Sequence, residues 1–199
     1  MYRNIAIGRL LSSLYGLKKF LRPCLVVLVI GLSLFSVQGQ SLQPMLISEK
    51  VPEEFWTREH LFYINGDTVR KSLQEYRGKL LILDFWSSNC GACIYQMKNK
   101  QQFKETLKDL VTLIPVNPPR TKDTYQSIVN IHNKHFKDKG DQGFSTIFQS
   151  DYLSALFPTY AYPMYVWISQ LGNVLAYSST ISENIVSELI KVHQLPKKD

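Results

Sequence analysis

Cysteine is scarce in this chain, whose 199 residues include three: Cys24, Cys90 and Cys93. Cys24 lies in an apolar segment near the start of the chain, so the remainder keeps two cysteines, placed three positions apart. Small exported domains that are stapled by disulfides need several pairs. The shortage therefore excludes a disulfide framework, and the apolar residues, 45% of the chain, must supply the core.

The chain also lacks the basic surface of a nucleic-acid-binding protein, although its formal net charge is +7. Residues 1–39 carry five basic side chains and no acidic one, so the remainder has 23 − 5 = 18 basic against 16 acidic residues, a net of +2. This is the balance of an ordinary soluble surface. We therefore expect no nucleic-acid partner.

No apolar run is long enough to span a bilayer comfortably. The run CLVVLVIGLSLF, from Cys24 to Phe35, has twelve residues, whereas a spanning helix needs about 20. It follows a basic stretch and precedes Val37 and Gly39, which stand at the −3 and −1 positions for signal peptidase. We therefore expect a signal peptide over residues 1–39 and an exported protein. The alternative is an uncleaved anchor, which would tether the protein to a membrane through residues 24–37.

The rest of the chain shows no internal repeat and no low-complexity tract, which favours one domain over residues 59–199 behind an extended lead-in at residues 40–58. Residues 60–69 predict a hairpin that turns at Asn65-Gly66. Continuous apolar residues predict further strands, at residues 80–86, 110–116, 144–148, 162–169 and just after the turn at 171–173. Helical patterns occupy residues 90–109, 124–136, 151–157 and 180–193. This order predicts an α/β fold, with parallel strands first and an antiparallel pair after them.

Cys90 and Cys93 follow the apolar run LLILDFW directly, and three kinds of site use such a pair. A zinc site needs four ligands; His132 and His135 could complete it, but their spacing is unlike that of zinc fingers. A structural disulfide would close too short a loop to constrain the unfolded chain much. A redox site fits best, because Cys90 stands where a strand gives way to a helix. The unpaired N–H groups and the dipole at a helix start stabilise a thiolate and lower the pKa of a thiol from about 8.5.

The segment ILDFWSSNCGAC resembles the active-site segment of the thioredoxin superfamily. GKLLILDFW and YPMYVWISQLGNVLA are similar to the TlpA/ResA-type thiol–disulfide oxidoreductases of bacterial envelopes, particularly those of Bacteroidetes. The resemblance covers residues 51–195. It implies a thioredoxin-like fold: a central mixed sheet flanked by helices, with an N-terminal extension and an insertion between the second strand and the strand that begins at a cis-proline.

By this resemblance Cys90 is the attacking thiol, Cys93 is the resolving thiol, and the two form the redox disulfide. Asp84 matches a buried acid that helps to move protons to and from the second cysteine. An Asp in an apolar strand must be paired or raised in pKa, which fits that role; an Asp that faces solvent at the strand end is the alternative. Pro163 matches the cis-proline of the family, which faces the cysteines and helps to hold a substrate chain.

Other residues near the pair bear on substrate binding. Asn89 and Ala92 replace the Trp and the Pro of the commoner W-C-G-P-C motif, and such loop residues tune the reduction potential. Tyr162 is bulkier than the usual Thr or Val before the proline, so it would crowd the sulfurs or offer a stacking surface to a partner. Trp86 is a further candidate for substrate contact, with aromatic core packing beneath the motif as the alternative.

Together these features predict an exported thiol–disulfide oxidoreductase that acts on client proteins, more as a reductase than as an oxidase. No cofactor and no metal are expected, and a membrane protein is expected to donate the electrons. The alternative is a binding module in which the cysteine pair is vestigial and the groove at Tyr162 docks a partner.

Overall fold

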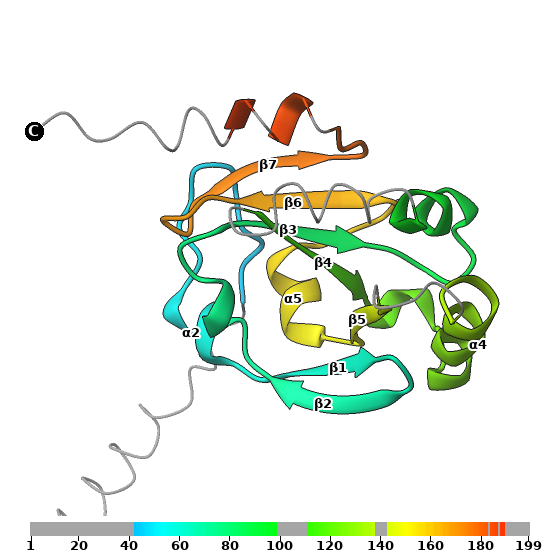
Figure 1. The fold of residues 1–199 in the computed structure, drawn as a ribbon. Helices are drawn as coiled ribbons and strands as arrows, with labels where there is room; N and C mark the ends of the chain where they lie inside the picture. The colour runs from blue at the N-terminus through cyan, green and yellow to red at the C-terminus, as the bar shows by residue number, and fades with distance from the viewer. Residues whose placement is uncertain (1–41, 99–110, 138–142, 183, 187, 190–199) are drawn as a thin grey trace, which may run out of the picture. The chain divides into compact units, whose positions relative to one another are not determined.

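The computed structural model describes residues 42–98, 111–137, 143–182, 184–186 and 188–189 of the chain. A seven-stranded sheet lies at the centre of this part, with helices beside it (Figure 1). The strands are β1 (His60–Ile64), β2 (Asp67–Lys71), β3 (Leu80–Phe85), β4 (Val111–Asn117), β5 (Ser145–Phe148), β6 (Met164–Ile168) and β7 (Val174–Ser178).

The strands lie in the order β2-β1-β5-β4-β3-β6-β7. Strands β3, β4 and β5 run parallel to one another, whereas β6 is antiparallel to β3 and β7 to β6. The hairpin of β1 and β2 adds the other edge, antiparallel to β5. The mixed α/β sheet predicted from the sequence, with parallel strands before an antiparallel pair, is confirmed.

Strand β3 lies inside the sheet, between β4 and β6, and every one of its six residues is buried. Such a continuous apolar run suits a strand that is covered on both faces. Its side chains alternate between two layers of the core. Leu81, Leu83 and Phe85 pack in one layer with α2 (Glu53–Thr57) and α5 (Asp151–Leu156). Leu80 and Ile82 pack in the other, which places Asp84 on that second face.

The second face is also the one that α4 (Tyr125–His135) and the helical segment 91–98 cover, through a cluster of apolar and sulfur-containing side chains. Thr124 begins α4 with a capping box, since its hydroxyl accepts from the N–H of Ser127 and the Ser127 side chain bonds back to the N–H of Thr124. This helix therefore starts where the sequence predicts it.

The hairpin turn between β1 and β2 lies where the sequence predicts it. Asn65 and Gly66 have φ values of 52° and 111°, as a tight hairpin turn requires. The short 3₁₀ helix η1 (Gln74–Tyr76) is followed by Gly78 with φ of 85°, a conformation that glycine adopts without strain.

The lead-in differs from the extended segment predicted over residues 40–58, because it contains the five-residue helix α2. Pro52 precedes this helix and Glu53 and Glu54 occupy its first turn, where acidic side chains are favourable. Phe55 and Trp56 are buried against the sheet, and this packing stabilises a helix too short to form alone. The residues before α2 include a turn at Ile47 and Ser48, and the N–H of Ser48 bonds to the carbonyl of Val174 in β7 at 2.8 Å.

Several predictions fall outside the described residues. These are the signal peptide at 1–39, the possible tether at 24–37, Cys24, and the continuation to residue 109 of the helix that follows Cys90. Within the described part of the chain, no helix combines the length and apolarity needed to cross a membrane.

Candidate active site

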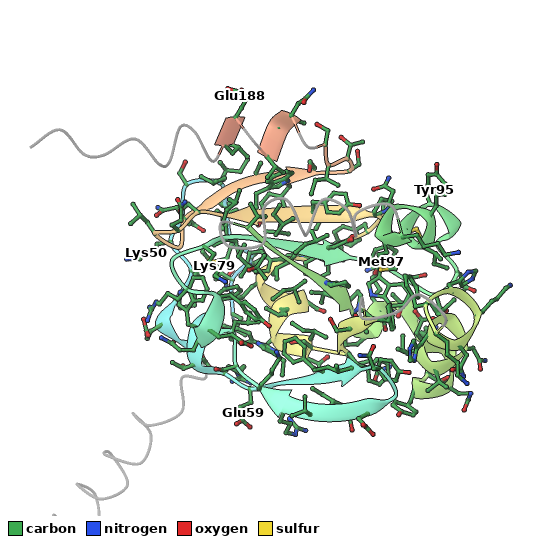
Figure 2. All side chains as sticks on the ribbon, viewed as in Figure 1. Lys50, Glu59, Lys79, Tyr95, Met97 and Glu188 are labelled. Carbon is green, nitrogen blue, oxygen red and sulfur yellow. A yellow bond between two sulfur atoms is a disulfide. The ribbon has the colours of Figure 1, made fainter. Side chains whose placement is uncertain are left out.

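The cysteine pair lies at the edge of the sheet where β3 and β4 end and β6 begins. Phe85 is the Cα partner of Val116 on one side and of Met164 on the other. The chain then leaves β3 through residues 86–89 and enters the helical segment 91–98, so Cys90 stands at the start of that helix. Figure 2 shows Tyr95 and Met97 of this helix at the opposite end of the sheet from Lys50 and Lys79.

Cys90 and Cys93 are joined by a disulfide, with their Cα atoms 5.3 Å apart. Cys90 is partly exposed, whereas Cys93 is 1% exposed and packs among apolar side chains. The backbone N–H of Cys93 donates to the Sγ atom of Cys90 at 3.1 Å. An amide from the first helical turn therefore points at the more accessible sulfur, which is the arrangement that stabilises a thiolate.

The turn before Cys90 is closed by hydrogen bonds within it. The N–H of Cys90 donates to the carbonyl of Ser87 at 3.0 Å, and the N–H of Asn89 donates to the Ser87 hydroxyl at 3.2 Å. Asn89 is exposed beside Cys90, and so are Gly91 and Ala92 after it. These small or polar residues leave the first sulfur open to a partner from outside.

Trp86 is placed in the core beneath this turn. Its side chain is fully buried, its indole N–H donates to the Thr146 hydroxyl at 2.9 Å, and its ring packs edge-on against Phe144. This position fits aromatic packing under the motif and gives the ring no solvent-facing surface for a substrate. Trp86 thus joins β3 to β5 and supports the cysteine loop from below.

Pro163 and Tyr162 come to the same edge of the sheet, just before β6. The Tyr162–Pro163 bond is cis, as the family resemblance implied. Both residues are half-buried, and Tyr162 packs against the clusters on both faces of the sheet, including the one that contains Cys93. The hydroxyl of Tyr162 is buried and has no hydrogen-bond partner among the described residues.

Asp84 is 1% exposed and lies on the sheet face that the cysteine helix covers. It is the Cα partner of Tyr165 in β6, whose hydroxyl donates to the Gln96 side-chain oxygen at 2.6 Å. Burial raises the pKa of Tyr165 well above its usual value, and the charge of Asp84 raises it further. The buried position rules out the solvent-facing alternative for Asp84 and places its carboxyl beside a polar link from β6 to the helix of Cys90 and Cys93.

The histidines proposed as zinc ligands have other partners. The Nδ1 atom of His132 is 2.7 Å from the Tyr63 hydroxyl, and its ring stacks on Phe144. The Nδ1 atom of His135 is 3.0 Å from the Lys98 Nζ atom. Among the described residues, no group of three or more His, Cys, Asp or Glu side chains is close enough together to hold a metal ion.

Sequence reasoning missed two features of this edge. The guanidinium of Arg120 lies over the ring of exposed Tyr160 at 4.7 Å, which joins the loop after β4 to the loop before β6. Asp123, also after β4, bonds to the turn before Cys90. A single polar residue in a loop carries no pattern, so neither contact had a signal in the sequence.

No protein-family model matches this sequence, and no curated protein matches it. Solved structures do. The thioredoxin domain of a thiol–disulfide oxidoreductase from Bacteroides vulgatus superposes with a TM-score of 0.54 at 15% identity, covering 73% of this chain and 99% of that one. The exposed lipoprotein thioredoxin Etrx1 from Streptococcus pneumoniae has a TM-score of 0.54 at 17% identity and covers 67% and 98%. The fold is thioredoxin-like.

A third thioredoxin-like structure of this kind is a secreted disulfide oxidoreductase from Mycobacterium tuberculosis, described as homologous to DsbE of E. coli. Its TM-score is 0.52 at 14% identity, with 71% of this chain and 99% of that one covered. At such identities the likeness shows the thioredoxin-like fold alone.

Proposed function

We propose that this protein is a thiol–disulfide oxidoreductase that exchanges dithiol and disulfide with client proteins through Cys90 and Cys93. The observation that carries the proposal is the unequal exposure of two bonded cysteines at a helix start. Cys90 is open to a partner and receives an amide hydrogen bond, whereas Cys93 is sealed beneath it. The thiol–disulfide oxidoreductases among the structures of the same fold support the proposal.

In the reducing direction the Cys90 thiolate attacks one sulfur of a client disulfide. The client S–S bond breaks, a mixed disulfide with Cys90 forms, and the released client thiolate takes up a proton. Cys93 then loses its proton and attacks the Sγ atom of Cys90, which frees the second client thiol. Two electrons and two protons have passed to the client, and the Cys90–Cys93 disulfide remains.

The role proposed for Asp84 belongs to the second step. Cys93 must be deprotonated while it is buried, and burial disfavours a free thiolate. The Asp84 carboxyl, enclosed on the face that the helix covers, is the group proposed to take that proton.

The surface for the client is proposed to include Pro163, Tyr162 and Asn89. Pro163 directly precedes β6, the strand next to β3, so a client chain laid beside it would lie close to Cys90. Asn89 is exposed and Tyr162 half-buried, so both offer contacts to such a chain.

Reduction is the proposed direction, in the cell envelope, with a dithiol donor in the membrane to restore the reduced pair. The basic and apolar segment at residues 1–39 supports export. The pneumococcal structure is of an exposed lipoprotein and the mycobacterial one of a secreted protein, which agrees with that location. Residues 24–37 would be the tether if the leader is kept.

The test is the redox equilibrium of the pair in a Cys24→Ala background, which leaves Cys90 and Cys93 as the sole cysteines. The chain is equilibrated with glutathione buffers, and the oxidised fraction is read by alkylation and mass. We expect a reversible two-electron transition and insulin-disulfide reduction that is lost in Cys90→Ala. A pair that stays inert across the series would instead indicate a partner-binding module.

Cys93→Ala separates the roles of the two sulfurs. Without the resolving thiol, Cys90 should remain attached to its client, so mixed disulfides should accumulate on a non-reducing gel. Cys90→Ala is the matched control and should form none. Equal adducts from both variants would contradict the assigned roles.

A further inference from the structure

The turn that leads into Cys90 is hydrogen-bonded to one residue of the loop after β4. The Oδ2 atom of Asp123 accepts the backbone N–H of Ser88 at 2.8 Å, and its Oδ1 atom accepts the Ser88 hydroxyl. Asp123 is 4% exposed. Both carboxylate oxygens are therefore committed to the residue two positions before the attacking cysteine.

A second polar residue fixes the carboxylate itself. Asn117, at the end of β4, is fully buried, and its Nδ2 atom donates to the Oδ2 atom of Asp123 at 2.7 Å and to the Trp86 carbonyl at 3.3 Å. Gln149 adds a bond from its Nε2 atom to the Asp123 carbonyl at 2.6 Å. The carboxylate thus accepts from the neutral groups of Ser88 and Asn117 and joins the end of β4 to the turn, and the backbone carbonyl of Asp123 adds a link to Gln149, which follows β5.

We propose that Asp123 is a positioning residue for Cys90. It acts through Ser88, whose two bonds set the turn, and the turn sets where the first helical amides point. A buried network with all donors satisfied is rigid, so the Cys90 sulfur is held near the Cys93 N–H. The inference rests on the proposed function, since it concerns how readily Cys90 becomes a nucleophile.

Two effects of Asp123 on Cys90 have opposite signs. Its negative charge disfavours a thiolate nearby, so loss of the charge alone would make Cys90 ionise at lower pH. Its hydrogen bonds hold the amides that favour the thiolate, so loss of the bonds would make Cys90 ionise at higher pH. The proposal is that the second effect is the larger one.

The experiment measures the rate of Cys90 alkylation by iodoacetamide against pH, in the reduced full chain with Cys24→Ala. We expect the midpoint of this profile to rise by about half to one pH unit in Asp123→Ala, the size expected when a helix start loses its hold on a charge. Asp123→Asn removes the same charge but keeps one acceptor oxygen, so its midpoint should lie below that of Asp123→Ala. Asp151→Asn, which removes an exposed carboxylate in the first turn of α5, is the charge control and should leave the midpoint unchanged.

The redox equilibrium gives a second readout. A less stable thiolate makes the reduced form less favourable, so Asp123→Ala should be about three- to tenfold more oxidised in the same glutathione buffer. A midpoint that falls, or does not move, in a folded Asp123→Ala would overturn the proposal. If Asp123→Ala does not fold, Ser88→Ala replaces it. That change removes the hydroxyl bond to Asp123 and leaves the bond from the backbone N–H of residue 88 in place. An unmoved midpoint in Ser88→Ala would also overturn the proposal.

Failure of the proposed function would look different. In that case the unsubstituted chain would fail to exchange with glutathione at all. If the unsubstituted chain exchanges and the Asp123 variants share its midpoint, the proposed function stands and the positioning role falls.

Discussion

Asp84 is a buried acidic residue close to the cysteine helix. It interrupts an otherwise apolar strand, and the structure encloses it on the face beneath the cysteine helix. A buried carboxyl costs folding free energy. Such a residue is expected where its chemistry is used, and under the proposed function that chemistry is the deprotonation of Cys93.

Asp84→Asn should therefore slow the second step of exchange and leave the first unchanged. An amide cannot take the proton of Cys93, so the mixed disulfide should last at least tenfold longer near neutral pH, with the deficit shrinking as the pH rises. Rapid-quench gels of a single turnover with a labelled client peptide would measure this lifetime. Asp67→Asn, an exposed change in β2, is the control. Equal lifetimes in the two variants would count against the proton role.

Single residues were predicted well where the sequence surrounds them with a pattern. Asp84 is flanked by apolar residues in a run that ends at Trp86, which indicates that both are buried, and the position of Cys90 after a strand indicates a helix start. Asp123 and Asn117 could not be found in this way, because their partners, Ser88 and Trp86, lie far off in the chain and meet them only after β3 and β4 pair.

Among the elements, β6 and the helix that contains Cys93 are joined by a side-chain hydrogen bond. The Tyr165 hydroxyl reaches from a fully buried ring to Gln96, on the second turn of that helix. Figure 2 shows the neighbouring Tyr95 pointing away from the body, and its side chain is 67% exposed, whereas Met97 is buried. Gln96 lies between these two positions on the helix, and its side chain joins the helix to β6.

Tyr165→Phe should loosen this anchor. We expect a loss of about 1 kcal/mol in the free energy of unfolding, the usual value of one hydrogen bond, and a shift in the glutathione equilibrium because the helix start moves. Urea unfolding and the glutathione series measure the two effects.

Tyr177→Phe is the matched control, since its hydroxyl donates to the Met45 carbonyl in the lead-in. It should cost similar stability and leave the redox equilibrium alone. A redox shift of the same size in both variants would show that it follows from lost stability and not from the bond between Tyr165 and Gln96.

Elements were predicted where length and pattern agree, and missed where packing decides. The six-residue run of β3 and the capped helix α4 carry strong local signals. Helix α2 is five residues long, and its formation depends on the burial of Phe55 and Trp56 against side chains from the whole sheet.

At the scale of the whole molecule, His60 links the edge hairpin to the start of α5. It opens β1, is 4% exposed, and its Nδ1 atom lies 3.0 Å from the Ser150 hydroxyl, which caps α5. Burial, together with nearby Arg58, lowers the pKa of His60 from 6.5 to about 4. The imidazole is therefore neutral in the folded chain above about pH 4.

This shift makes global stability depend on pH. Between pH 6.5 and about 4 the unfolded chain binds a proton at His60 and the folded chain does not, so stability falls as the pH falls through that window and the loss ends near the folded pKa. One proton corresponds to at most about 1.4 kcal/mol per pH unit, so we expect a loss of roughly 2 kcal/mol across the window.

His60→Gln retains a polar partner for Ser150 and does not titrate. Urea unfolding of the unsubstituted chain and of His60→Gln at pH 7, 6, 5 and 4.5 measures both free energies of unfolding. The free energy of the unsubstituted chain should fall relative to that of His60→Gln as the pH falls. His132 and His135, whose pKa values are also lowered by burial, contribute to each curve equally and cancel in the difference. Parallel curves would mean that His60 takes up its proton as easily in the folded chain as in the unfolded one.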